Sequence, residues 1–127
     1  MIFIVDDDSA IRDSLWVLLD CVGLEAREFA SAEAFLEARQ LADKDCLVLD
    51  VHMPGMSGIE LLEQLRHRGD EVPVIIITGQ PSATNDRRAR AAGALAVLEK
   101  PFKPSEILGL VRQALSEQPG SGARPMY

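Results

Sequence analysis

Groups that could act together follow four short apolar segments of this sequence. They are Asp6, Asp7 and Asp8 after residues 2–5, Asp50 after residues 46–49, Thr78 after residues 72–77, and Lys100 after residues 95–98. If the carboxylates meet, two like charges 4 Å apart repel by about 4 kcal/mol at an effective dielectric constant near 20. Such a cluster either raises the pKa values of its members or binds a cation. Mg²⁺ is the expected cation because it prefers oxygen ligands and takes few carboxylates; an acidic surface cluster without an ion is the alternative.

A carboxylate surrounded by a divalent cation, an ammonium and a hydroxyl is suited to phosphoryl chemistry. The cation and Lys100 would neutralise phosphoryl oxygens, and Thr78 would donate a hydrogen bond to one of them. Asp50 would be the nucleophile and form an acyl phosphate, while Gly79, which has no Cβ, would leave room for access. Taken alone, Thr78 is an ordinary strand-end residue and Lys100 an ordinary solvated lysine. Their joint placement indicates the chemistry.

The elements that would position these groups alternate between strand and helix five times. Apolar runs predict strands over 2–5, 24–30, 46–50, 72–77 and 95–98, and helices are expected to begin near Ser9, Ser31, Ser57, Ser82 and Pro104, with Ser9 as a candidate N-cap of the first helix. Ser57 with Glu60 three residues later forms a capping-box pattern, which supports the start of the third helix. Such alternation predicts a parallel sheet with helices on both faces. Right-handed crossovers then place the ends of strands 1, 3, 4 and 5 along one edge of the sheet.

Composition limits the function classes further. The 127 residues fit one domain, with 47% hydrophobic and 26% charged residues and a net charge of −7. This acidic balance argues against nucleic-acid binding by the chain itself. No apolar run approaches the roughly 20 residues of a membrane span, and no basic segment precedes the first apolar run as in a signal peptide, so a cytoplasmic location is expected. Cys21 and Cys46 are expected to be buried free thiols, and residues 117–127 a flexible tail or linker.

These motifs resemble the receiver domain of two-component response regulators. The likeness covers Ile2 to about Leu115. It rests on the segments Val5–Asp8, Leu49–Gly58, Ile77–Gly79 and Glu99–Phe102. The resemblance implies a single (βα)5 flavodoxin-like domain over residues 1–116, with a five-stranded parallel sheet in the order 2-1-3-4-5. It further implies that Asp50 accepts a phosphoryl group from the phosphohistidine of a sensor histidine kinase or phosphotransfer protein. The domain would then change conformation to control an output domain or protein partner, with a homodimer as one outcome.

The resemblance also implies a role for each residue of the site. Asp7 and Asp50 would hold Mg²⁺ directly, together with the backbone carbonyl of His52, and Asp6 would assist through a water molecule. Thr78 and Lys100 would bind the phosphoryl oxygens, and the peptide bond between Lys100 and Pro101 is commonly cis in this family. The protein would not be an enzyme in the usual sense, because it catalyses only its own phosphorylation and dephosphorylation.

Two features depart from the family pattern. Receiver domains usually carry Tyr or Phe three residues before the lysine, where the ring switches rotamer, but Val97 stands there in this sequence. The expected fourth helix carries arginines at 87, 88 and 90 and few apolar residues. Both departures lie on the face that usually carries output, so the resemblance leaves the mode of signalling open.

The segments Ser31–Leu36 and Glu99–Phe102 look like those of the nitrogen-fixation regulator subgroup. That subgroup often has a DNA-binding domain behind the receiver, and none is seen in this sequence. The chain is therefore expected to be either a stand-alone receiver or a shortened chain.

Three other classes of protein share parts of the pattern. A phosphatase of the haloacid dehalogenase type would use Asp6 as its nucleophile, but its motif requires Thr or Val where Ala10 stands, and Asp50 would have no role. A receiver-like interaction module that is never phosphorylated usually lacks an acid, the threonine or the lysine, all of which are present here. A flavodoxin needs a phosphate-binding loop after the first strand, where three aspartates would repel a phosphate.

Overall fold

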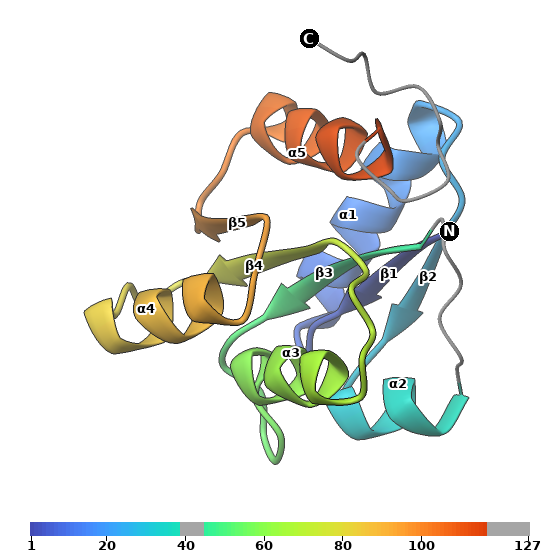
Figure 1. Cartoon of the computed structure of the whole chain (residues 1–127). Helices are drawn as coiled ribbons and strands as arrows, with labels where there is room; N and C mark the ends of the chain where they lie inside the picture. The colour runs from blue at the N-terminus through green and yellow to red at the C-terminus, as the bar shows by residue number, and fades with distance from the viewer. Residues whose placement is uncertain (39–44, 117–127) are drawn as a thin grey trace, which may run out of the picture.

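The computed structural model describes residues 1–38 and 45–116, in which strands and helices alternate along the chain (Figure 1). The strands are β1 (Ile2–Val5), β2 (Ala26–Phe29), β3 (Cys46–Asp50), β4 (Val74–Thr78) and β5 (Ala96–Glu99). The helices are α1 (Ser9–Cys21), α2 (Ala32–Ala38), α3 (Gly58–His67), α4 (Ala83–Ala91) and α5 (Pro104–Ser116). The five predicted strand–helix pairs are all present.

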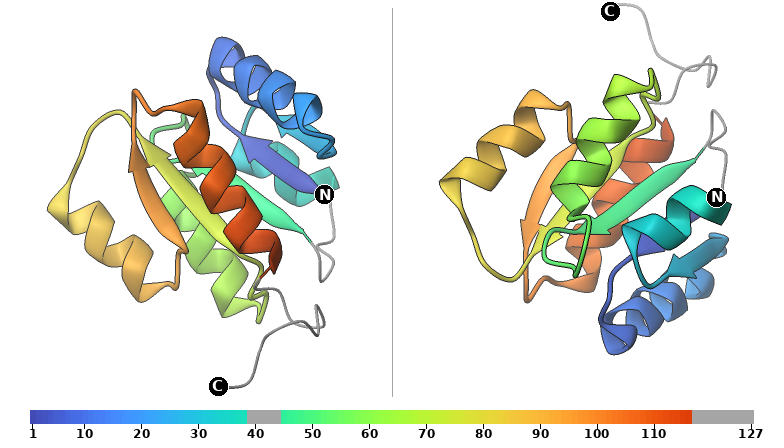
Figure 2. Two further views of the ribbon diagram at one scale, coloured as in Figure 1. Left: turned by 90° about the horizontal axis from the view of Figure 1, so that it is seen from above. Right: turned by 90° about the horizontal axis from the view of Figure 1, so that it is seen from below.

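All strand pairs are parallel, and the order across the sheet is β2-β1-β3-β4-β5, as predicted. Helices α1 and α5 cover one face of the sheet, and α2 and α3 cover the other (Figure 2). The fold class expected from the sequence is confirmed. Because every strand runs in the same direction, the carboxyl ends of β1, β3, β4 and β5 lie along one edge.

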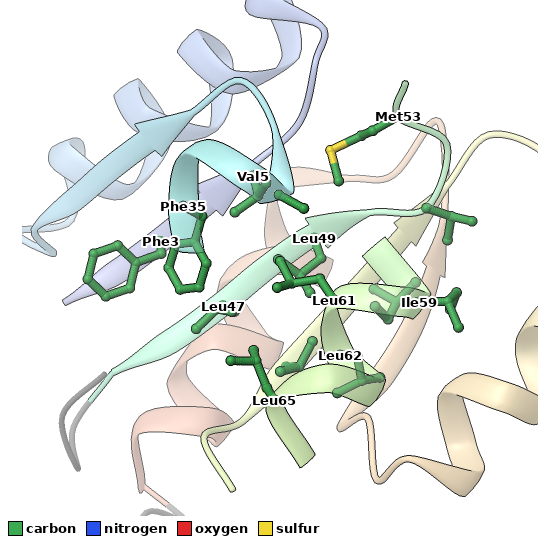
Figure 3. Packing of buried hydrophobic residues seen from close by; sticks show 14 of the residues in the cluster. Phe3, Val5, Phe35, Leu47, Leu49, Met53, Ile59, Leu61, Leu62 and Leu65 are labelled. Atoms are coloured by element: carbon green, nitrogen blue, oxygen red, sulfur yellow. The ribbon is translucent and has the colours of Figure 1, made fainter. Parts of the chain in front are cut away.

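Alternate residues of the three central strands pack into two separate cores, which is why these strands read as continuous apolar runs. Phe3, Leu47 and Leu49 face α2 and α3, where their side chains meet Phe35 and the leucines of α3 (Figure 3). The rings of Phe3 and Phe35 are 5.6 Å apart between centroids and lie edge to face. Their neighbours along β1 and β3 face α1 and α5. Packing on both faces thus holds the central strands in place as far as the edge where the polar residues lie.

Helix α1 begins at Ser9, but its N-cap lies one residue earlier than the sequence suggested. Asp8, not Ser9, is the N-cap: its Oδ1 accepts from the backbone N–H groups of Ala10 (2.9 Å) and Ile11 (3.3 Å). The prediction of Ser9 was wrong because a short carboxylate immediately before a serine can supply the same acceptor. The capping box at α3 is confirmed, with both Ser57 and Glu60 accepting as expected.

Two other expectations need correction. The fourth strand begins at Val74 rather than Val72 and includes Thr78; Pro73, which has no N–H, precedes it. Cys46 is buried, and burial raises the pKa of its thiol to about 12. Cys21 is a free thiol but exposed, because it ends α1 on the side opposite the buried Leu19.

In the ranges 1–38 and 45–116, no helix is both long and apolar enough to cross a membrane. The tail predicted at residues 117–127 lies outside the described residues.

Candidate functional site

The polar groups singled out in the sequence stand where the register of the central strands places them. Val5 pairs with Leu49, so Asp6, the residue after Val5, lies beside Asp50. Asp50 pairs in turn with Ile77, which puts Thr78 one residue further along β4. Asp6 and Asp50 are 44 positions apart in the sequence, and the parallel register of β1 and β3 brings them together.

Three carboxylates meet at this edge. Asp6, Asp7 and Asp50 each offer one carboxylate oxygen, and these three oxygens lie within 4.8 Å of one another. Asp6 and Asp50 are buried, with exposed fractions of 0% and 3%, whereas Asp7 is exposed. The convergence expected from the sequence is therefore observed, and one side of the cluster is open to solvent.

Lys100 reaches this cluster from the end of β5. Its Nζ donates to Asp50 Oδ1 at 3.0 Å and to Asp6 Oδ2 at 3.4 Å. Burial alone would lower the pKa of the ammonium, but the hydrogen bond and charge of Asp50, together with those of Asp6, raise it above its usual value. Lys100 is thus held in its charged form. The peptide bond between Lys100 and Pro101 is cis.

The two buried acids carry raised pKa values. For Asp50 burial is the largest cause, and the charges of Asp6 and Asp7 add to it, while the hydrogen bond from Lys100 opposes it. For Asp6 burial also dominates, opposed by the backbone N–H of Asp8 and by Lys100. One lysine does not compensate for three carboxylates, so a cation that approached from the exposed side would relieve the remaining repulsion.

This imbalance predicts that Asp50→Asn stabilises the metal-free protein at about pH 7. A carboxyl group whose folded-state pKa is raised contributes stability below its unfolded pKa and loses it as the pH rises through the folded pKa. The neutral amide avoids that loss, so its advantage in unfolding free energy should shrink as the pH falls toward 4. Urea unfolding in EDTA at several pH values measures the difference between variant and wild type. A variant less stable than wild type near neutral pH would contradict the raised pKa.

The donor set fits Mg²⁺. Carboxylate oxygens are the ligands that this ion prefers, and it usually keeps several waters, which the exposed side of the cluster allows. Asp7 and Asp50 are the carboxylates that would hold it, with Asp6 behind them. His52, whose backbone carbonyl is the third expected ligand, lies two residues after Asp50 in the loop that leaves the same edge, and it is exposed.

We expect Mg²⁺ to stabilise the fold through this cluster. An ion at about 100 times its dissociation constant adds roughly 2.7 kcal/mol to the unfolding free energy. Thermal melts with Mg²⁺ and with EDTA measure the shift, which Asp7→Ala should abolish. Asp20→Ala, which removes an exposed aspartate near the end of α1, should leave the shift unchanged. Identical melting temperatures of the wild type in Mg²⁺ and EDTA would contradict the metal site.

Thr78 belongs to the same edge, but its hydroxyl is engaged elsewhere. The side chain is 5% exposed. Its Oγ1 accepts from the backbone N–H of Gln80 and donates to the carbonyl of Gln80, both at 3.1 Å. The structure therefore brings Asp6, Asp7, Asp50 and Lys100 into contact range, and it places Thr78 beside them with its hydroxyl directed to the following loop.

Two contacts at the site had no counterpart in the sequence analysis. Arg12 Nη1 donates to the backbone carbonyl of Asp6 at 2.7 Å, and its Nε lies 3.4 Å from Glu28 Oε1, so it ties the loop after β1 to β2. Gly58 packs so closely on the carbonyl of Asp50 that a Cβ there would run into that oxygen. Spacing indicates neither contact, because the partner in each case is a backbone atom.

Comparison with known proteins assigns the chain to a family. The sequence model of the response regulator receiver domain matches residues 2–112. The chain is a receiver domain. Receiver domains of response regulators act in two-component systems, where they interact with kinases and output domains.

Two similar relatives are longer than this chain. The receiver domain is 41% identical over 121 residues to the transcriptional regulatory protein FixJ of Azorhizobium caulinodans, covering 95% of this chain and 57% of FixJ. It is 39% identical over 119 residues to the response regulator protein TodT of Pseudomonas putida, covering 94% of this chain and 52% of TodT. The chain thus spans about half the length of these relatives. The likeness to FixJ supports the predicted resemblance to the nitrogen-fixation subgroup.

Solved structures agree with this assignment. The crystal structure of FixJ-N superimposes with a TM-score of 0.79 at 36% identity, covering 91% of this chain and 93% of that one. A CheY-like receiver domain protein from Methanospirillum hungatei JF-1 gives a TM-score of 0.83 at 33% identity, with coverages of 91% and 93%. The response regulator StyR gives 0.85 at 43% identity, but this chain covers only 58% of that one.

Proposed function

We propose that this receiver domain accepts a phosphoryl group on Asp50 from the phosphohistidine of a sensor histidine kinase or phosphotransfer protein, and then controls an output domain or partner. The observation that supports this most directly is the position of Asp50: buried at the end of β3, paired with Lys100 at 3.0 Å, and within 4.8 Å of two further carboxylates. Because such kinases draw their phosphoryl groups from ATP, we assign the reaction to the cytoplasm.

The transfer needs a carboxylate nucleophile and a compensated negative charge. An oxygen of Asp50 attacks the phosphorus, the bond between phosphorus and the imidazole nitrogen breaks, and the imidazole leaves with the electron pair. Lys100, already charged beside Asp50, neutralises a phosphoryl oxygen. When bound, Mg²⁺ supplies further charge neutralisation and orients the phosphoryl oxygens. The protein's own contribution is to hold these groups in place, which is the dominant requirement in phosphoryl transfer.

Thr78 would bind a phosphoryl oxygen after exchanging its present partner. In the unmodified protein its hydroxyl donates to the carbonyl of Gln80 and accepts from the N–H of Gln80, so donation to a phosphoryl group requires that the bond to the carbonyl break. We therefore assign Thr78 a part in the response to phosphorylation. The reaction modifies this chain alone, so we do not class it as an enzyme acting on a separate substrate.

A small phosphodonor tests the proposal without the partner kinase. In the presence of Mg²⁺, acetyl phosphate should add one phosphoryl group, detected by intact-mass spectrometry and removed by hydroxylamine, as expected of an acyl phosphate. Asp50→Asn should abolish the label. Lys100→Ala should slow labelling about 10²-fold, the usual effect of removing one stabilising charge, while still binding Mg²⁺.

Controls separate this proposal from the alternatives. Lys103→Ala removes an exposed lysine three residues further on and should label like wild type. A label that persists in Asp50→Asn but disappears in Asp6→Asn would favour the phosphatase class. Absence of any label in wild type, even with kinase and Mg²⁺, would favour a receiver-like module that is not regulated by phosphorylation.

A further inference from the structure

The loop between β3 and α3, residues 51–57, leaves the sheet directly after Asp50 and projects from its edge (Figure 1). Its base is fixed by two backbone hydrogen bonds. The N–H of Val51 donates to the carbonyl of Ile77 at 3.0 Å, and the N–H of Gly58 donates to the carbonyl of Val51 at 3.2 Å. The base of the loop therefore follows the sheet.

The apex of this loop is different. Pro54 and Gly55 are exposed, and the last buried side chain before them is Met53. Exposed loop residues without hydrogen bonds to the rest of the fold have low local stability. If the loop is to keep one conformation beside Asp50, its apex needs a contact of its own.

Glu33, in the first turn of α2, supplies such a contact. Its Oε2 accepts a hydrogen bond from the backbone N–H of Met56 at 2.9 Å, across 23 positions of sequence. This bond is the largest cause of a lowered pKa for the Glu33 carboxyl group, and a bond from its own backbone N–H adds to it. The side chain is thus ionised at neutral pH, and a hydrogen bond to an ionised acceptor is about twice as strong as a neutral one.

Gly55 is shaped to receive this carboxylate. A Cβ at Gly55 would lie 2.5 Å from Glu33 Oε2, so the carboxylate lies directly against the loop backbone. Gly55 also has a φ of +78°, which a residue with a side chain rarely adopts. At the apex, the missing Cβ of Gly55 leaves space for the Glu33 carboxylate, and the Met56 N–H donates a hydrogen bond to it.

We propose that Glu33 is a positioning residue of the phosphorylation site: it holds the apex of the loop after Asp50, and through the loop it keeps the His52 carbonyl oriented for Mg²⁺. This role rests on the proposed function. Glu33 contacts neither the carboxylate cluster nor Lys100, so its influence passes through the backbone of residues 52–56. The Glu-to-backbone bond closes the loop at its apex as the Val51 bonds close it at its base.

Calorimetric titration of the full chain with Mg²⁺ tests the role. Groups bonded directly to a metal ligand typically change metal affinity 10–100-fold when lost. Glu33 acts one step further away, so Glu33→Ala should raise the dissociation constant about threefold to tenfold. Glu33→Gln keeps an acceptor oxygen without the charge and should stay within about twofold of wild type. Glu37→Ala removes an exposed glutamate from the same helix and should have no effect.

A second readout needs no metal. In EDTA, hydrogen exchange at the Met56 amide should accelerate most in Glu33→Ala, less in Glu33→Gln, whose neutral acceptor makes a weaker bond, and not at all in Glu37→Ala. If Glu33→Gln weakens Mg²⁺ binding as much as Glu33→Ala, the effect is one of charge and the positioning role is overturned. If wild type binds Mg²⁺ and Glu33→Ala matches Glu37→Ala in both readouts, the role is likewise overturned while the proposed function stands. Failure of wild type to bind Mg²⁺ overturns the metal site, and the role of Glu33 with it.

Discussion

Gly58→Ala is expected to destabilise the fold by about 3 kcal/mol. Gly58 is the first residue of α3, and its Cα packs against the end of β3. A Cβ there would collide with the carbonyl oxygen of Asp50 and lie 2.9 Å from the carbonyl carbon and 3.3 Å from the Cβ of Leu49. These atoms belong to a fully buried central strand, so they cannot move aside as a flexible side chain would. Overpacking of this kind usually costs 1–3 kcal/mol, and sometimes more.

Urea unfolding in EDTA measures this cost, and Gly109→Ala provides the matched control. Gly109 lies inside α5 and is exposed, and a Cβ there would meet no atom within 4 Å apart from the backbone of its own helix and its chain neighbours. Alanine there should stabilise by up to about 1 kcal/mol, the usual difference between Gly and Ala inside a helix. The same substitution is thus expected to have opposite signs at the two positions. A loss below about 1 kcal/mol for Gly58→Ala would show that β3 and α3 can separate, and would contradict a rigid Asp50.

The contrast between these glycines shows what the sequence could and could not reveal. Both are single glycines near the start or middle of a predicted helix, and neither residue type nor spacing distinguishes them. What differs is the distance from the neighbouring backbone, which depends on how α3 docks on β3. The apolar runs and the alternation of elements were sufficient for a parallel sheet with the ends of strands 1, 3, 4 and 5 along one edge. The strand order, and with it the meeting of Asp6 with Asp50, was expected from the resemblance to receiver domains and is observed.

Contacts between a side chain and a distant backbone atom were the part that the sequence did not predict. Arg12 on the Asp6 carbonyl and Glu33 on the Met56 amide each join segments with no common motif. The sequence did not predict the direction of the Thr78 hydroxyl either, because groups at the site and backbone groups of the following loop can both form hydrogen bonds with it. The N-cap of α1 was predicted wrongly for a related reason. Asp8 and Ser9 both offer a side-chain acceptor, and local geometry decides which of them caps the helix.

Helix α4 is weakly anchored to the domain. Ala89 is its one buried residue, and the guanidinium of Arg88 pairs with Glu63 of α3 at 2.6 Å and 3.1 Å on the surface. Arg66 donates to the carbonyls of Ala92 and Gly93 at the far end of the helix. The carboxyl end of α4 is therefore tied to α3, whereas its amino end follows the loop that begins at Gln80.

A cavity of about 400 Å³ lies beside the amino end of α4. Its lining includes the apolar side chains of Val51, Ile59, Ile76 and Val97, together with Thr78. Valine is short and stiff at χ1, so Val97 cannot swing into this space as an aromatic ring would. The cavity leaves room for the start of α4 and the preceding loop to move instead.

We expect phosphorylation to change hydrogen exchange across residues 80–92 by at least about tenfold, with the largest change at the amino end of α4. To donate to a phosphoryl oxygen, the Thr78 hydroxyl must release its bond to the Gln80 carbonyl, and the loop that follows then loses one of its two links to this side chain. A ligand shifts such an equilibrium by its differential affinity for the two states. Exchange with and without beryllofluoride, a phosphoryl mimic, measures the response, while Val97 should change little.

Thr78→Ala tests whether the hydrogen bonds between Thr78 and Gln80 couple the site to α4. The variant should already show fast exchange at Gln80 without beryllofluoride, because the two bonds are absent, and the mimic should then add little across α4. Thr84→Ala, on the exposed surface of α4, should respond like wild type. If the change in protection instead centres on Leu95–Leu98 and α4 is unaffected, the switch runs through β5 and this mechanism is wrong. A wild-type response confined to α5 would point to the last helix, the other element through which a receiver could pass the signal by dimerising.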